Sequence, residues 1–220
     1  SGAIAVGRKV IGIQERPKDL ATKQACAAVG QARLMMVYQR LFGEYSQIAS
    51  QILMTKSTMV NTVSRENAKN CFDELFRMGI IPIVNENDAI SVEEEAYGNF
   101  GDNDTMAAHV ARLVEADLLI LMSDIEGLYT DDPRKNPNAR FVHTVRYIDE
   151  KLERMGKGAG SAMGTGGMAT KIEAAKVATK SGADMVIANG ANICAINDIM
   201  AGKKIGTLFM AERENGRKII

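Results

Sequence analysis

Apolar runs that do not alternate with polar residues place the strongest limit on how this chain can fold. GIIPIV (79–84) and LLILM (118–122) are apolar throughout, and helix-like segments separate them from DMVIANG (184–190). Strands that are apolar on both faces are typical of parallel sheets covered by helices on both sides. The sequence therefore predicts an α/β fold, a three-layer α/β/α sandwich with a mostly parallel central sheet.

Helices are expected where apolar residues recur at helical spacing, and strands where short apolar runs end in polar or glycine residues. The chain starts with SGAIAVG, in which Ser1–Gly2–Ala3 reads as a loop that follows a strand, and DDPRKNPNAR (131–140) reads as a second loop. The predicted helices cover residues 22–42, 64–78, 105–115, 148–156, 168–182 and 196–202, and the predicted strands cover 48–54, 79–84, 118–122, 184–190 and 206–210.

Composition excludes several classes of function. The 220 residues carry a net charge of zero, which argues against nucleic acid or an anionic lipid surface as a partner. No apolar run approaches the roughly 20 residues that span a bilayer. The three cysteines lack CxxC spacing, so we expect reduced thiols in the core of a cytoplasmic protein.

Polar clusters follow the predicted strands. In open parallel sheets, ligands bind outside the carboxyl ends of the strands. One such cluster can equally be a turn or a helix cap, but several in one chain favour a ligand site. The clusters are TKST (55–58), NEND (85–88), GDND (101–104), SD (123–124) and ANG (188–190).

GTGGMATK (164–171) is a weak phosphate-binding signal. Glycines before a helix let backbone N–H groups converge on an anion, and Lys171 adds a point charge. The segment is not a Walker A loop, since GxxxxGK(S/T) is unmatched. It fits the dinucleotide pattern GxGxxA, but no strand precedes it as a dinucleotide fold requires. The two histidines are isolated and GxSxG is missing, so neither a metal site nor nucleophilic hydrolysis is expected.

Taken in order, five motifs resemble the amino acid kinase family and, within it, the glutamate 5-kinases. They are SGAIAVG, VNENDAI, FGDNDT, LMSDIEGLYTDDPR and GTGGMATK, and the similarity continues to GTLF near the end. The resemblance implies that residues 1–220 form an amino acid kinase domain. Its substrate-binding part would be about 1–115, and its nucleotide-binding part about 116–220.

The resemblance implies ATP-dependent phosphorylation of the γ-carboxylate of L-glutamate, the first step of proline biosynthesis. It also implies Mg²⁺ with the ATP, feedback inhibition by proline and a homo-oligomer. Lys171 would stabilise the transferring phosphoryl group, and Asp104 would orient the catalytic lysines. Ser1, Asp88 and Asn103 would bind glutamate. The nucleotide would be held by Ser123, Asp124, Thr165, Gly166, Gly167, Met168, Ala169, Thr170 and Lys171.

One departure from the family concerns the start of the chain. Members begin with a strand and a Lys-x-Gly-(Ser/Thr) loop, and many carry an RNA-binding-like C-terminal domain. Neither feature is found here, so we expect an N-terminally truncated domain that alone is poorly soluble or catalytically silent. A non-catalytic sensor of proline or glutamate is one alternative. An acetylglutamate, aspartate or uridylate kinase is another, although NENDA argues against it.

Overall fold

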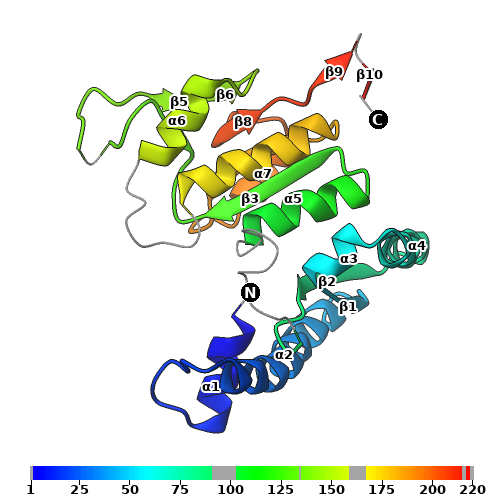
Figure 1. Ribbon diagram of the computed structural model, residues 1–220. Helices are drawn as coiled ribbons and strands as arrows, with labels where there is room; N and C mark the ends of the chain where they lie inside the picture. Colours follow the sequence, from blue (N-terminus) through cyan, green and yellow to red (C-terminus); the bar gives the residue numbers. More distant parts are fainter. Residues whose placement is uncertain (1, 91–102, 134, 159–166, 215–216, 219–220) are drawn as a thin grey trace. The chain divides into compact units, whose positions relative to one another are not determined.

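The computed structural model describes residues 2–90, 103–133, 135–158, 167–214 and 217–218 (Figure 1). The chain divides into two compact units, Ser1–Gly98 and Asn99–Ile220, and each unit has its own sheet. Helices and strands alternate in both, and the longest strands of each sheet pair in parallel. The predicted α/β class is therefore confirmed.

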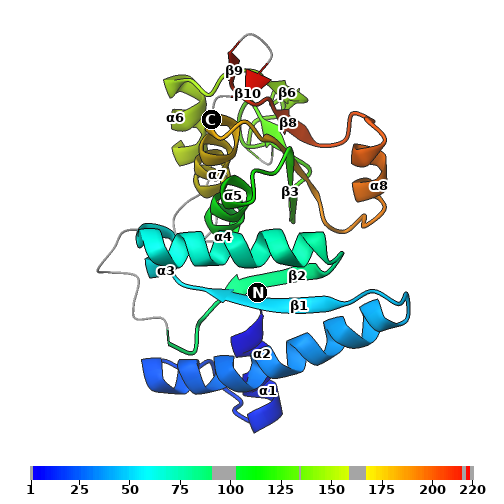
Figure 2. The same ribbon diagram turned by 90° about the vertical axis from the view of Figure 1, so that its right-hand side faces the viewer.

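The first unit is a two-stranded parallel sheet between two layers of helices (Figure 2). Helices α1 and α2 lie on one face of the sheet, and α3 and α4 lie on the other. The predicted strands and long helices are confirmed, but the second strand continues into the first two residues of NEND. The elements are α1 (Ala3–Ile11), α2 (Leu20–Gly43), β1 (Ala49–Met54), α3 (Lys56–Val60), α4 (Thr62–Arg77) and β2 (Ile81–Glu86).

The loop predicted over Ser1–Gly2–Ala3 is wrong at Ala3, where helix α1 begins, and this helix was not predicted. Two glycines lie where α1 crosses α2. A Cβ atom added at Gly30 would lie 1.7 Å from the carbonyl oxygen of Ala3, and one at Gly7 would lie 1.8 Å from that of Cys26. Glycine weakens helix propensity, so the sequence suggested a loop; here it lets two helix backbones touch.

The second unit contains a four-stranded sheet in the order β3-β7-β8-β6. Strands β3 and β7 are parallel, as are β6 and β8, whereas β7 and β8 are antiparallel. Helices α5 and α7 cover one face, and α8 lies on the other side (Figure 2). The elements are α5 (Asn103–Leu113), β3 (Leu118–Ser123), β4 (Leu128–Tyr129), β5 (Phe141–Val142), β6 (Thr144–Val145), α6 (Glu150–Gly158), α7 (Met168–Lys180), β7 (Asp184–Asn189), α8 (Ala195–Met200), β8 (Thr207–Phe209), β9 (Arg213–Glu214) and β10 (Arg217–Lys218).

Buried alanines let α5 and α7 pack closely against each other and against the sheet. Ala108 of α5 and Ala174, Ala175 and Ala178 of α7 are fully buried, in one cluster with Leu121 of β3. Small side chains allow a close helix–helix approach with little loss of packing density. This contact fixes the relative position of the two helices that begin at Asn103 and Met168.

A short hairpin that the sequence analysis did not predict follows Ser123 and Asp124. Strands β4 and β5 pair in antiparallel fashion, on either side of the loop that was predicted over 131–140. The buried Thr207 hydroxyl accepts a hydrogen bond from the Leu128 N–H at 2.8 Å and donates one to the Val142 carbonyl at 2.6 Å. One threonine of β8 therefore fastens the hairpin to the sheet.

Two expectations from composition have different outcomes. Cys26 is buried as predicted, whereas Cys71 and Cys194 are exposed, so the prediction of core thiols is wrong for these two. All three are free thiols. Within the described ranges, no helix is long and apolar enough to span a membrane.

Candidate active site

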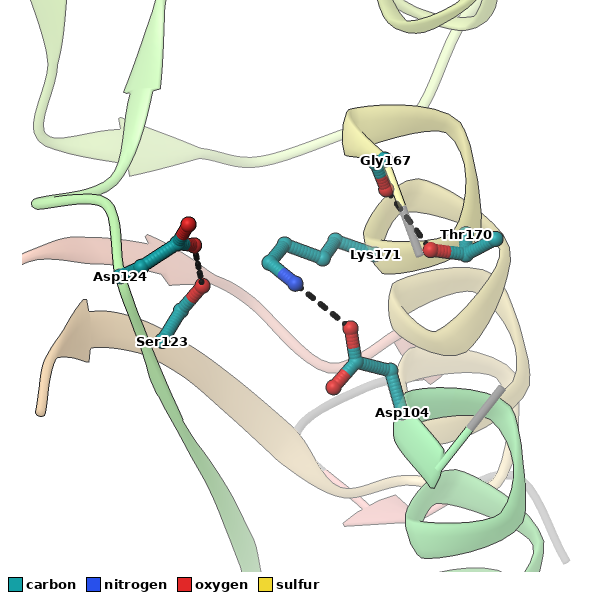
Figure 3. Close-up of polar contacts among 6 residues, drawn as sticks. All are labelled: Asp104, Ser123, Asp124, Gly167, Thr170 and Lys171. Carbon is teal, nitrogen blue, oxygen red and sulfur yellow. Dashed lines mark hydrogen bonds and ion pairs between the residues drawn. The ribbon is translucent and has the colours of Figure 1, made fainter. Parts of the chain in front are cut away.

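Lys171 and Asp104 form a largely buried ion pair between two helices of the second unit (Figure 3). The Nζ atom of Lys171 lies 2.7 Å from Oδ2 of Asp104, and the two side chains are only 9% and 20% exposed. Both residues lie in the first turn of their helices, α7 and α5. The alanine packing of these helices thus brings together two charges that are 67 positions apart in the chain.

The start of α7 carries no side-chain cap. Gly167 is the N-cap residue, and the Thr170 hydroxyl donates to the Gly167 carbonyl at 2.7 Å instead of accepting from a backbone N–H. A Cβ atom added at Gly167 would meet nothing within 4 Å. The first N–H groups of a helix point outward and favour anions, so this end of α7, with Lys171 beside it, suits a phosphate group.

Ser123 and Asp124 lie at the carboxyl end of β3, and the Lys171 side chain extends toward them from α7 (Figure 3). The Ser123 hydroxyl donates to Oδ1 of Asp124 at 3.1 Å. The N–H of Gly190, just after β7, donates to the Ser123 carbonyl at 2.7 Å. The sequence-predicted nucleotide residues of the second unit that are described, from Ser123 to Lys171, thus gather at one edge of its sheet.

The first unit contains a cavity of about 230 Å³. Burial raises the pKa of the Asp88 carboxyl above its ordinary value. The described lining carries two acidic side chains and no basic one, so it suits a small ligand with a positive charge. The lining residues are Ala3, Ala27, Ala28, Gln31, Ala32, Gln51, Leu53, Glu86, Asn87, Asp88 and Ala89.

Three amide side chains, Gln31, Gln51 and Asn85, form a hydrogen-bonded chain at this cavity, called the amide relay below. Nδ2 of Asn85 donates to Oε1 of Gln31 at 2.9 Å, and Nε2 of Gln31 donates to Oε1 of Gln51 at 3.2 Å. Gln31 and Asn85 are buried. Gln31 and Gln51 were not predicted as site residues. Their signal in the sequence was a glutamine inside a predicted helix and another inside a predicted strand.

The remaining predicted site residues have different outcomes. Ser1, Thr165 and Gly166 lie outside the described residues. Asn103 begins α5 in the second unit, next to Asp104, whereas Asp88 follows β2 in the first. Over the part of the chain that the structure describes, no group of three or more His, Cys, Asp or Glu residues could hold a metal ion.

Known proteins similar to this chain agree on one family. The profile of the amino acid kinase family matches residues 2–189. The glutamate 5-kinase of Carboxydothermus hydrogenoformans is 51% identical over 97% of this chain and 56% of its own length. That of Clostridium perfringens is 49% identical over 97% of this chain and 80% of its own. The chain therefore spans little more than half of the first relative and four fifths of the second.

The fold is also found in solved structures of more distant proteins. The isopentenyl phosphate kinase of T. acidophilum, solved as a product complex, has a TM-score of 0.57 and 17% sequence identity, covering 93% of this chain and 78% of its own. At that identity the similarity establishes the amino acid kinase fold alone. With the family match over residues 2–189 and about half of all positions identical to the relatives above, this chain belongs to the amino acid kinase family, among the glutamate 5-kinases.

Proposed function

We propose that this chain is the amino acid kinase domain of an enzyme that transfers the γ-phosphoryl group of ATP to the γ-carboxylate of L-glutamate. The product is L-glutamyl 5-phosphate, and the reaction is the first step of proline biosynthesis. The observation that carries the proposal is the buried Lys171–Asp104 pair at the uncapped start of α7. An anion-binding helix end with one fixed cation suits a phosphoryl group.

For this reaction the protein mainly has to align the two substrates and place positive charge near the transferred phosphoryl group. A glutamate side chain has a pKa of about 4.3, so the attacking carboxylate is already ionised at neutral pH and needs no general base. Phosphoryl transfer then depends on alignment and on positive charge over the γ-phosphate. Asp104 holds the Lys171 ammonium in one place, so the cation does not have to reorganise when charge develops.

The nucleotide site we propose lies at the edge of the second sheet. Ser123 and Asp124 would hold the nucleotide, and the segment from Thr165 to Lys171 would hold its phosphates. Mg²⁺, when bound with ATP, neutralises charge on the phosphate oxygens. The phosphates of ATP would supply oxygen ligands to Mg²⁺.

The amino-acid site we propose includes the cavity of the first unit. Asp88 would pair with the substrate ammonium, and the resemblance to the family also assigns glutamate binding to Ser1 and Asn103. The substrate-binding part would then be about 1–115 and the nucleotide-binding part about 116–220, within a three-layer sandwich. Proline shares the α-carboxylate and carries an ammonium group, so we expect it to inhibit at this site. We also expect a homo-oligomer.

The test is an acceptor panel with the full-length gene product, ATP and Mg²⁺, measuring ADP release. L-Glutamate should support turnover, and N-acetylglutamate and L-aspartate should not. In parallel, calorimetry measures the binding of L-glutamate and of proline to the same protein. Binding of these amino acids without ADP release would identify a non-catalytic sensor, and preference for N-acetylglutamate would identify a different kinase of this family. Either result would overturn the proposal.

A further inference from the structure

We propose that Gln31 is a positioning residue for the amino-acid substrate. Through the amide relay it would fix the orientation of Asn85 and Gln51, so that neutral N–H groups, not a cation, meet a carboxylate of the substrate. The inference rests on the proposed function, because it states how the cavity of the first unit recognises its amino acid. Gln31 itself acts through its two amide neighbours.

The sheet register places the relay on one face. In the pairing of β1 with β2, Gln51 lies opposite Ile83, and Leu53 lies opposite Asn85. Alternate residues of a strand share a face, so Gln51, Leu53 and Asn85 point to the same side of the sheet. Gln31 of α2 meets them on that side and is only 7% exposed. Three separate elements therefore converge on one set of hydrogen bonds beside the cavity.

The hydrogen bonds give the relay a direction. Asn85 donates to Gln31, and Gln31 donates to the side-chain oxygen of Gln51. The Nε2 atom of Gln51 donates to no residue within the described ranges, although Gln51 lines the cavity. An amide N–H group at the wall of a cavity can donate a hydrogen bond to an acceptor atom of a bound ligand, and that bond stabilises the complex. Because Gln31 occupies the side-chain oxygen of Gln51, the N–H groups of this exposed lining residue are left for a ligand or for water.

The charges of the cavity explain why neutral donors matter. Glu86 and Asp88 line it, and no Lys, Arg or His is found in the described lining. A glutamate molecule brings one ammonium group and two carboxylates. The acidic side chains suit the ammonium group and repel the carboxylates, so a carboxylate at this cavity needs uncharged donors held in place. Donors at fixed positions also reject ligands of the wrong length.

The first test replaces Gln31 in the full-length gene product. Gln31→Met has similar length but neither donates nor accepts, so both relay bonds are lost. We expect the KM for glutamate to rise about 5–100-fold, from two hydrogen bonds of ordinary strength. The KM for ATP should stay within about twofold. The control is Gln47→Met, the same exchange at an exposed position, which should leave both constants unchanged.

The second test separates positioning from simple packing. Gln31→Glu keeps the oxygen that accepts from Asn85 but, when ionised, cannot donate to Gln51. The ratio of the KM for glutamate of Gln31→Glu to that of the wild type should be high at pH 8. The ratio should fall as the pH is lowered, because a protonated carboxyl donates again. A merely structural residue would give a ratio that does not change with pH.

The outcomes decide the inference independently of the proposed function. An unchanged glutamate KM in Gln31→Met, or equal losses for glutamate and ATP, would overturn it. If Gln31→Met does not fold, the pH dependence of Gln31→Glu decides, and a flat ratio overturns it. If the wild type binds glutamate without turnover, the proposed function fails. Calorimetric Kd values for glutamate then replace KM in the same comparisons.

Discussion

Lys171 and Asp104 lie in the first turns of neighbouring helices, with their charged atoms 2.7 Å apart. A buried ion pair is weak evidence for stability, because the cost of removing both charges from water can exceed their attraction. A fixed ammonium group beside the proposed phosphate site would stabilise the negative charge of the transferring phosphoryl group. We therefore propose that the pair serves catalysis.

Replacing the lysine should slow the chemical step. Lys171→Met removes the cation at similar length, and we expect kcat to fall about 10²–10³-fold, as for the loss of one transition-state donor. ATP affinity should change much less. Lys176 of the same helix pairs with Glu153 and Glu173 at 2.8 and 3.2 Å, so Lys176→Met removes a comparable charge away from the site. Equal kcat values for the two variants would contradict the assignment.

Asp104 and Lys171 should act as one unit. Asp104→Asn keeps the shape but weakens the hold on the ammonium group, so kcat should fall. The double variant Asp104→Asn/Lys171→Met should be no slower than Lys171→Met alone, because residues that act together lose activity non-additively. Kinetics of the four proteins in a double-mutant cycle measure this. If the fold-decrease in kcat of the double variant equals the product of the two single decreases, Asp104 has a role separate from that of Lys171.

The sequence predicted the class of fold and most of its elements, because apolar runs and helical spacing are local signals. Strands β1, β2, β3 and β7 were all anticipated. Helix α1 was missed because Gly7, which weakens helix propensity, serves a contact with α2, a separate helix that begins at Leu20. The β4–β5 hairpin was missed because Thr207, far along the chain, holds it in place.

The candidate site was predictable to different degrees. Polar strand ends marked Ser123 and Asp88 from general rules for parallel sheets. The partnership of Asp104 with Lys171 followed only from family resemblance, because no local pattern links residues 67 positions apart. Gln31 was missed because a single glutamine in a helix predicts nothing until β1 and β2 are placed against it.

Asp88→Asn should weaken glutamate binding selectively. The change removes a charge at nearly constant shape, and a charge-assisted contact contributes roughly 1.5–3 kcal/mol, or about 10–150-fold in the KM for glutamate. The KM for ATP should be spared, because the nucleotide residues belong to the other unit. Steady-state kinetics with each substrate varied in turn measure both constants. Equal losses for glutamate and ATP would instead identify Asp88 as part of a structural turn.

Asp88 and Asp19 should contribute to the pH dependence of stability with opposite signs. Burial raises the pKa of Asp88 above 3.8, so the folded state binds a proton more tightly than the unfolded state. Stability is then lost as the pH rises from 3.8 through the raised pKa, and the penalty persists at neutral pH. Without ligand, Asp88→Asn should raise Tm at pH 7, and the gain should shrink as the pH falls toward 3.

Asp19 provides the matched comparison. Its carboxyl caps α2 and accepts from the Thr22 N–H at 2.8 Å, and this hydrogen bond lowers its pKa. The stability it contributes is present above pH 3.8 and lost as the pH falls through the lowered pKa. Asp19→Asn should therefore lower Tm at pH 7, with a deficit that shrinks in acid. Thermal unfolding from pH 3 to 7 measures both variants, and Tm shifts of the same sign would contradict the assignment for Asp88.

Trapping the product with hydroxylamine tests directly whether the enzyme phosphorylates the γ-carboxylate of glutamate. The full-length gene product is incubated with ATP, Mg²⁺, L-glutamate and hydroxylamine, and the hydroxamate formed is identified by mass spectrometry and chromatography against authentic standards. We expect γ-glutamyl hydroxamate in an amount equal to the ADP released, with almost none from the Lys171→Met variant. Formation of the α-hydroxamate, or ADP release without any hydroxamate, would contradict it.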